Sequence, residues 1–169
     1  MSETVAMGML ERRRIEAKLL AHVYATVSDS HGKAAADQVV GESVRRAAIE
    51  QGAEMAGQLG GETSLATFIA AQELWTRGNA LAVEVAEASS KRFAFRVTRC
   101  EYARMYKDMG LGHIGHLLSC QRDGTFCEGY DARLKLKRTQ TIMQGADHCD
   151  FDYTYQDVPA GGGADTPTT

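Results

Sequence analysis

The stretch that decides the fold is residues 81–97, which read LAVEVAEASSKRFAFRV. Apolar side chains alternate with polar or small ones on either side of a Ser-Ser-Lys segment at 89–91. A period of two is typical of strands with one buried face, and a short turn between two such strands pairs them in antiparallel fashion. The sequence therefore predicts a β-hairpin near the middle of the chain.

The residues before the hairpin, 8–78, have the spacing of helices instead. The first predicted helix has one face, at spacings of three and four, made of Ile15, Leu19, His22, Val23 and Thr26. It ends within residues 28–32. An alanine-rich helix follows at about 34–59, with Val40, Val44, Ala47 and Ala48 on one side and glycines that predict close packing. A third helix begins after Thr63 or Ser64, either of which suits the N-cap, and carries Leu65, Phe68, Ile69 and Trp75.

Beyond the hairpin, the pattern predicts helices at 101–109 and 112–120, a loop at 124–131, and strands at 134–142 and 149–155. The order β-β-α-α-β-β after a helical half is typical of an α+β fold, with helices against a small antiparallel sheet of about four strands. We expect a single domain over residues 1–157, with a helical part at 8–78 and the sheet plus two helices at 79–157. The glycine- and threonine-rich tail at 158–169 is expected to be disordered.

The composition limits the classes of function. Of the 169 residues, 44 % are hydrophobic and 24 % charged, and the net charge is −3. Such a chain has no electrostatic footprint for nucleic acid or an anionic membrane, and no apolar run is long enough for a membrane span. Without a secretion-signal pattern, we expect a cytoplasmic protein. The common nucleotide-binding and hydrolase fingerprints (GxGxxG, GxxxxGK[ST], GxSxG, HExxH) are absent.

The cysteines are the first candidates for chemistry. The chain has four cysteines: Cys100, Cys120, Cys127 and Cys149. No two of them form a CxxC pair, so zinc-ribbon and thioredoxin motifs are absent. In a reducing compartment they are thiols, metal ligands or catalytic groups, or simply small buried side chains. Cys100 precedes the helix at 101–109, where the helix dipole and nearby arginines favour its thiolate; burial would oppose this. Cys127 falls in the predicted loop and is treated as incidental.

Two further groups of polar residues accompany these thiols. On a helix, His113, His116 and Cys120 would form one stripe, which Asp123 extends if the helix continues. Such a stripe can hold a metal or pair a nucleophile with its base; alternatively the histidines lie on a solvated edge and Cys120 packs in the core. In the second group, Asp147 and His148 precede Cys149, at a pocket mouth or simply in a turn.

These residues together resemble a known family. The segments VTRCEYA at 97–103, Leu111-Gly112 leading to Cys120 and Asp123, and GADHCDF at 145–151 are similar to the bacterial L-2-amino-thiazoline-4-carboxylic acid hydrolase family. The resemblance extends over residues 10–155 in layout, and its specific motifs lie within 95–155. It implies a hydrolase that opens the ring of a small cyclic amidine, amide or N-heterocycle by cleaving a C–N bond.

Two mechanisms follow from this resemblance and the chemistry of the residues. In one, the thiolate of Cys100 or Cys149 attacks the ring carbon while Asp123, Asp147 or a histidine moves protons. In the other, a metal activates water; zinc is the first choice, and its ligands would be Cys100, Cys120, Cys149 and His113. The complete catalytic set is Cys100, Cys120, Cys149, Asp123, Asp147 and His113. Arg99, Tyr102 and Arg138 are the candidates for binding the substrate, since a guanidinium matches a carboxylate.

Other classes of function stay open at this point. The segment GADHCDF also looks like the end of small-molecule sensing domains named after vinyl reductase, in which a cysteine contributes to a zinc site. A sensor of this kind would bind a small molecule or zinc without catalysis. A scaffold role is the third class, and for all three we expect a homo-oligomer without nucleic-acid or membrane partners.

Overall fold

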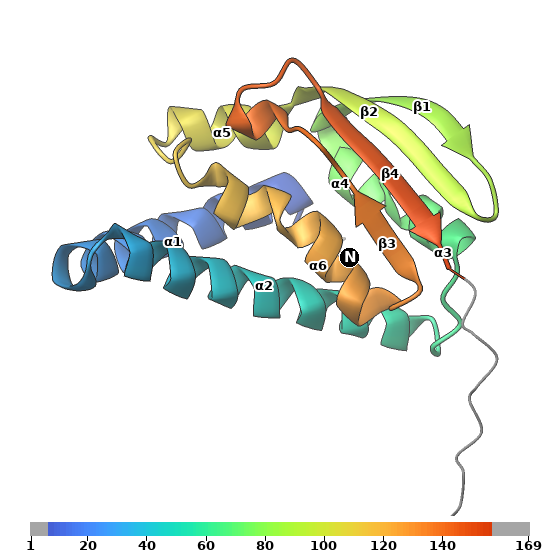
Figure 1. Cartoon of the computed structure of the whole chain (residues 1–169), viewed down its shortest axis with the longest axis horizontal. Helices are drawn as coiled ribbons and strands as arrows, with labels where there is room; N and C mark the ends of the chain where they lie inside the picture. The colour runs from blue at the N-terminus through green and yellow to red at the C-terminus, as the bar shows by residue number, and fades with distance from the viewer. Residues whose placement is uncertain (1–6, 157–169) are drawn as a thin grey trace, which may run out of the picture.

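A computed structural model describes residues 7–156 as an antiparallel sheet with helices against one face (Figure 1). The helices are α1 (Met9–His31), α2 (Lys33–Gln58), α3 (Leu65–Ala71), α4 (Glu73–Thr76), α5 (Glu101–Asp108) and α6 (Arg122–Tyr130). Short helical turns are η1 (Arg77–Asn79), η2 (His116–Cys120) and η3 (Ile142–Gln144). The strands are β1 (Leu81–Ala88), β2 (Arg92–Cys100), β3 (Leu134–Lys137) and β4 (Cys149–Tyr155). The predicted α+β class and the helical N-terminal half are therefore confirmed. The tail at 158–169 lies outside the described residues.

The predicted hairpin is present as β1 and β2, and it organises the sheet. The strand order is β1-β2-β4-β3, with antiparallel neighbours throughout. In this order β4 lies beside β2, so that Val97 is opposite Cys149 and Phe95 is opposite Phe151. Pairing these strands places the start of β4 next to the end of β2, where Cys100 leads into α5. Two of the cysteine motifs, far apart in the sequence, thereby meet at one end of the sheet.

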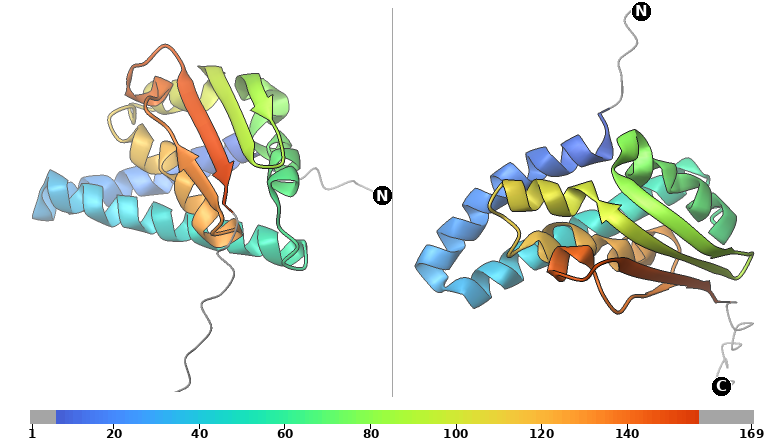
Figure 2. Two further views of the ribbon diagram at one scale, coloured as in Figure 1. Left: turned by 45° about the vertical axis from the view of Figure 1, so that its right-hand side comes forward. Right: turned by 90° about the horizontal axis from the view of Figure 1, so that it is seen from above.

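The long α1–α2 hairpin lies across the helical side, with α6 between α2 and the sheet (Figures 1 and 2). The predicted second helix is confirmed at Lys33–Gln58. Ser64 is the N-cap of α3, since its hydroxyl accepts from the Thr67 amide at 3.1 Å. Within residues 7–156, no helix combines the length and the apolarity that crossing a membrane requires.

Two predicted elements between β2 and β3 are wrong. The expected helix at 112–120 is a series of turns followed by the π-helical turn η2, and the expected loop at 124–131 is the helix α6. Gly124 and Gly129 suggested a loop, but Gly129 is needed for packing: a Cβ atom there would lie 1.9 Å from the Ile49 carbonyl oxygen of α2. Tertiary packing overrides helix propensity here, and Cys127 is a buried residue of α6.

Two smaller predictions also differ from the structure. The predicted apolar face of α1 is not its buried face, since Ile15 is 49 % and Leu19 is 68 % exposed. The helix buries Arg13, Ala17 and Tyr24 instead. The third strand ends at Lys137 rather than near residue 142. After it, the backbone amides of residues 139 and 140 donate to the carboxylate of Asp150 and not to a neighbouring strand.

A buried carboxylate ties the start of β3 to the end of β4 and the segment before α3. Asp131 accepts hydrogen bonds from Arg133, from the Tyr155 hydroxyl at 2.7 Å and from the Thr63 hydroxyl at 2.8 Å. Burial alone would raise the pKa of Asp131, but these hydrogen bonds outweigh it and hold the pKa well below the usual value. The ionised form is therefore the one that stabilises the fold.

We expect Asp131→Asn to lower the free energy of unfolding at pH 7 by roughly 2–3 kcal/mol, because hydrogen bonds to a charged group are lost. A carboxyl group with a depressed folded pKa stabilises above its unfolded pKa, and the stabilisation is lost as the pH falls through the folded value. The difference between wild type and variant should therefore shrink below about pH 4. Urea unfolding of the wild type and of Asp131→Asn, at pH 7 and below about pH 4, measures this difference in the free energy of unfolding. Asp152→Asn, which removes a half-exposed pair with Arg92, is the control and should cost less than about 1 kcal/mol.

Candidate functional site

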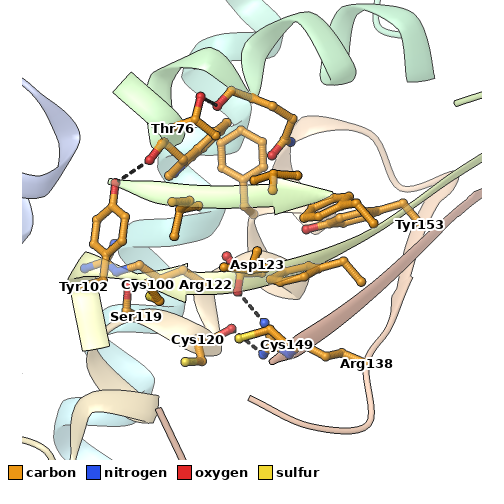
Figure 3. A pocket seen from close by; sticks show the side chains of 18 of the residues that line it. Thr76, Cys100, Tyr102, Ser119, Cys120, Arg122, Asp123, Arg138, Cys149 and Tyr153 are labelled. Carbon is orange, nitrogen blue, oxygen red and sulfur yellow. Dashed lines mark hydrogen bonds and ion pairs between the residues drawn. The ribbon is translucent and has the colours of Figure 1, made fainter. Parts of the chain in front are cut away.

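A cavity of about 120 Å³ lies between the inner face of the sheet and the helices (Figure 3). Its wall is mostly apolar and includes Phe68, Trp75, Phe95, Phe126, Phe151 and Tyr153. These rings pack on one another, for example Phe95 on Phe151 with centroids 4.7 Å apart. An aromatic wall with a few polar groups is the usual composition of a small-molecule site.

Three of the four cysteines line this cavity from three different elements. Cys100 is the N-cap of α5, Cys120 ends the π-helical turn η2, and Cys149 begins β4. The sulphur of Cys100 accepts the Ala103 amide at 3.4 Å, and that of Cys149 accepts the Ile142 amide at 3.2 Å. Cys127, the fourth, is buried and does not line the cavity. The pairing of β2 with β4 and the π-helical turn thus bring together the thiols of all three motifs.

Burial decides the protonation state of these thiols. It raises the pKa of Cys100 to about 11 and that of Cys120 to about 12, and it also raises the pKa of Cys149. For Cys100, the amide of Ala103 at the start of α5 acts in the opposite direction but is the smaller effect. The sequence left open whether the helix N-terminus or burial has the larger effect on the pKa of Cys100. Burial has the larger effect, so Cys100 is a neutral thiol.

We expect all four cysteines to react slowly with iodoacetamide at neutral pH. Because the thiolate is the reactive form, a pKa near 11 lowers the rate at least about 100-fold relative to free cysteine. Mass spectrometry of the alkylated protein against time measures the rate at each thiol, and the protein unfolded in guanidinium chloride is the control. One cysteine reacting as fast as free cysteine in the folded protein would contradict the expectation.

A carboxylate and a guanidinium form the main polar pair of the cavity. Arg138 donates to the Asp123 carboxylate and, at 2.7 Å, to the carbonyl oxygen of Cys120. About a third of the Asp123 side chain is uncovered, yet burial raises the pKa of this carboxyl above its usual value, with Arg138 acting against it. Asp123 also lines the cavity. Figure 3 shows Asp123 between the thiols and the aromatic wall.

The cavity contains six of the nine residues singled out in the sequence: Cys100, Cys120, Cys149, Asp123, Tyr102 and Arg138. The hydroxyl of Tyr102 donates to the Trp75 carbonyl oxygen at 3.1 Å, which fixes the ring at the cavity wall.

The other three residues lie elsewhere. His113 is exposed and makes an edge-on ring contact with Tyr24. Asp147 is exposed and pairs with His148, and Arg99 pairs with Glu101 on the surface. The proposed set of zinc ligands does not assemble: within residues 7–156, no three His, Cys, Asp or Glu side chains are placed to hold a metal ion.

The sequence analysis missed six polar residues of the cavity wall: Arg13, Gln51, Gln72, Thr76, Ser119 and Arg122. Arg13 had a usable signal. It interrupts a stripe at spacings of three and four that continues through Leu10, Ala17, Leu20, Tyr24 and Val27, all of them buried or partly buried. An arginine in such a stripe must find a buried partner. The other five residues carry no comparable signal in the sequence.

The structure is thus an α+β fold with a cavity lined by three thiols and an aromatic wall. The chain belongs to the L-2-amino-thiazoline-4-carboxylic acid hydrolase family, whose model matches residues 12–153. The family suggested by the cysteine motifs is therefore confirmed. No protein of curated function matches the chain.

Two solved structures with a loosely similar fold are examples of what the chain resembles. The phenol-responsive sensory domain of the transcription activator PoxR, with phenol, has a TM-score of 0.47 and 11 % identity over 82 % of this chain and 73 % of that one. A trafficking protein particle complex subunit 3 from Naegleria fowleri, covalently bound to palmitic acid, has a TM-score of 0.45 and 12 % identity over 85 % and 97 %. Similarities this loose do not bear on function.

Proposed function

We propose that the protein is a hydrolase that opens the ring of a small cyclic amidine or amide by cleaving a C–N bond. The observation that carries the proposal is the convergence of three motif cysteines with the Asp123–Arg138 pair on one cavity. Family membership supports the reaction class. The volume of about 120 Å³ limits any ligand of this cavity to a small molecule, since a cavity of about 150 Å³ binds benzene.

Asp123 is the proposed group that moves protons. An acid–base catalyst works best when its pKa lies near the working pH, and burial moves the pKa of Asp123 upward, in that direction. Arg138 acts in the opposite direction and favours the ionised form of Asp123, which is the form that a base requires. Asp147 lies outside the cavity, so of the two aspartates predicted to be catalytic Asp123 is the one that can reach a bound ring.

Cys120 is the proposed nucleophile. It lies three residues before Asp123, and Arg138 contacts both residues. After burial, the charge of Asp123 is the strongest influence on the ionisation of Cys120, whereas for Cys100 and Cys149 other groups come before it. The sulphurs of Cys100 and Cys149 already accept backbone amides. A neutral thiol beside a carboxylate can be deprotonated as it attacks, so a resting thiolate is not needed.

For a cyclic amidine, the reaction passes through a covalent intermediate on Cys120. The sulphur of Cys120 bonds to the ring carbon, its proton passes to Asp123, and Asp123 delivers it to the ring nitrogen. The ring C–N bond then breaks, while a proton from the exocyclic amino group passes to the leaving nitrogen and leaves an imine. Water adds to the same carbon; one of its protons goes to the imine nitrogen and the other returns to sulphur as the C–S bond to Cys120 breaks. The sum is one water consumed and one C–N bond cleaved.

The test is turnover of 2-amino-thiazoline-4-carboxylate by the purified protein, followed by mass spectrometry of the ring-opened product. We expect Cys120→Ser to lower kcat at least about 100-fold, because a hydroxyl is a far weaker nucleophile than a thiol. Cys127→Ser is the matched control: this buried cysteine donates to the Asp123 carbonyl oxygen, a contact that serine keeps. Full activity in Cys120→Ser would show that Cys120 is not the nucleophile. The remaining mechanism would then be direct attack by water, with Asp123 as the base.

Binding without catalysis is the second candidate function, and one observation favours it. All the thiols of the cavity are neutral at physiological pH because burial raises their pKa values. A sensor needs the cavity but no nucleophile. Tight binding of ring compounds without turnover in the same assay would support this candidate over hydrolysis.

A further inference from the structure

A network of buried charges lies at the end of the cavity formed by α1, α2 and α6. Arg13 contacts Glu16 at 2.8 Å and Gln51 at 2.8 Å, and Arg122 contacts Glu16 at 3.0 Å. Arg13 is 3 % and Arg122 is 8 % exposed, and both line the cavity. The Nε atom of Arg122 donates to the Leu118 carbonyl oxygen at 2.9 Å. Its second terminal nitrogen, Nη1, takes part in neither contact.

The charges of this network do not cancel. Two buried guanidinium groups share the single carboxylate of Glu16, which a third, half-exposed arginine, Arg12, also contacts at 3.0 Å. Gln51 is neutral. Burial and the nearby charge of Arg13 lower the pKa of Arg122 to about 10. Among the residues that line the cavity, the remaining charged pair, Asp123 with Arg138, is balanced within itself. A buried cation without full compensation is costly, so this end of the cavity favours an anion.

We propose that Arg13 and Arg122 form the subsite that binds the carboxylate of the substrate, and that these two residues determine the preference for a carboxylate over a neutral group at this position. The proposal rests on the hydrolase function proposed above and assigns the recognition group of that site. Guanidinium groups match carboxylates in charge and geometry. Arg138 is the weaker candidate for this task, since its charge is already compensated by Asp123.

The placement fits the proposed chemistry. In Figure 3, Arg122 lies on the side of Tyr102 and Ser119, Arg138 lies on the side of Cys149, and Asp123 lies between them. A ring whose carboxylate points to Arg122 would therefore present its remaining atoms towards Asp123 and the thiols. Recognition would use the Arg122 side of the cavity, and reaction would take place beside it, at Asp123.

The test compares two ligands of equal shape that cannot be hydrolysed in this way, thiazole-4-carboxylate and thiazole-4-carboxamide. Trp75 is the single tryptophan of the chain and lines the cavity, so its fluorescence measures binding. We expect the carboxylate to bind the wild type at least about tenfold more tightly than the amide. Arg13→Gln and Arg122→Gln should each reduce this preference to about twofold or less. Arg46→Gln, on the exposed side of α2, is the control for loss of one positive charge and should keep it.

Several results would overturn the subsite. These are equal binding of the two probes by the wild type, no binding of the carboxylate at millimolar concentration, or a preference that disappears only in Arg138→Gln. If the glutamine variants do not fold, Arg13→Lys and Arg122→Lys keep the charge but lose the forked geometry, and the preference should fall several-fold. Because no turnover is measured, the subsite and the hydrolase function can fail separately. Ring opening without carboxylate preference would refute only the subsite, and preference without ring opening only the hydrolase.

Discussion

Asp123→Asn is expected to lower kcat for ring opening by about 10²–10⁴-fold, the range typical of a lost acid–base group. Asparagine keeps the size of the side chain and an oxygen that can accept from Arg138, but it can neither take nor return a proton. Circular dichroism of the variant should match that of the wild type. The control is Asp147→Asn: this aspartate belongs to a sequence motif yet is exposed and outside the cavity, so kcat should stay within about twofold, as for most surface changes.

The pH dependence gives a second readout of the same residue. Because burial raises the pKa of Asp123, the acidic limb of the kcat profile should lie above the usual aspartate value of about 4. Arg138 lowers the pKa of Asp123, so Arg138→Gln should move that limb to still higher pH. A limb that stays in place in Arg138→Gln would show that another group carries the proton, even if Asp123→Asn is inactive.

The residues that converge on the cavity were largely predictable, and the reason is local. Cys100 and Cys149 lie at the ends of strands whose period of two is long and clear, and pairing β2 with β4 is enough to bring them together. Cys120 and Asp123 were placed together by their spacing, although the predicted helix at 112–120 is a set of turns with a π-helical turn at its end. Cys120 and Asp123 still lie close together, because the helical turn η2 leads almost directly into α6.

The charged end of the cavity was not predictable in the same way, because it depends on contacts between distant segments. Arg122 meets Glu16 across 106 positions of sequence, and Arg13 meets Gln51 across 38. The face of α1 was wrongly assigned for the same reason. Ile15 and Leu19 are apolar but exposed. Arg13 is buried beside the cavity, where its guanidinium donates to Glu16 of the same helix and to Gln51 of α2. Hydrophobic periodicity can place Arg13 on the buried stripe of α1, but it cannot identify Gln51 of α2 as the partner of its guanidinium.

The contact between α2 and α6 decides where Asp123 lies, and glycine makes that contact possible. A Cβ atom at Gly129 would lie 1.9 Å from the Ile49 carbonyl oxygen and 3.0 Å from the Ala53 amide nitrogen, both backbone atoms of α2. On the other side, a Cβ atom at Gly52 would lie 2.3 Å from the Phe126 carbonyl oxygen of α6. No side-chain rotation can relieve overlaps with backbone, so any larger residue must push the two helices apart.

Gly129→Ala is therefore expected to lower the free energy of unfolding by about 3 kcal/mol or more, at or above the upper end of the usual cost of overpacking. Urea unfolding followed by circular dichroism measures this. Gly124→Ala is the matched control on the same helix, since a Cβ atom there meets nothing within 4 Å; it should stabilise by about 0.5–1 kcal/mol through helix propensity alone. Because α6 carries both Asp123 and Arg122, folded Gly129→Ala should also lose ring-opening activity. Similar stability of the two variants would mean that α2 and α6 are not in backbone contact, and the position of Asp123 at the cavity would lose its structural basis.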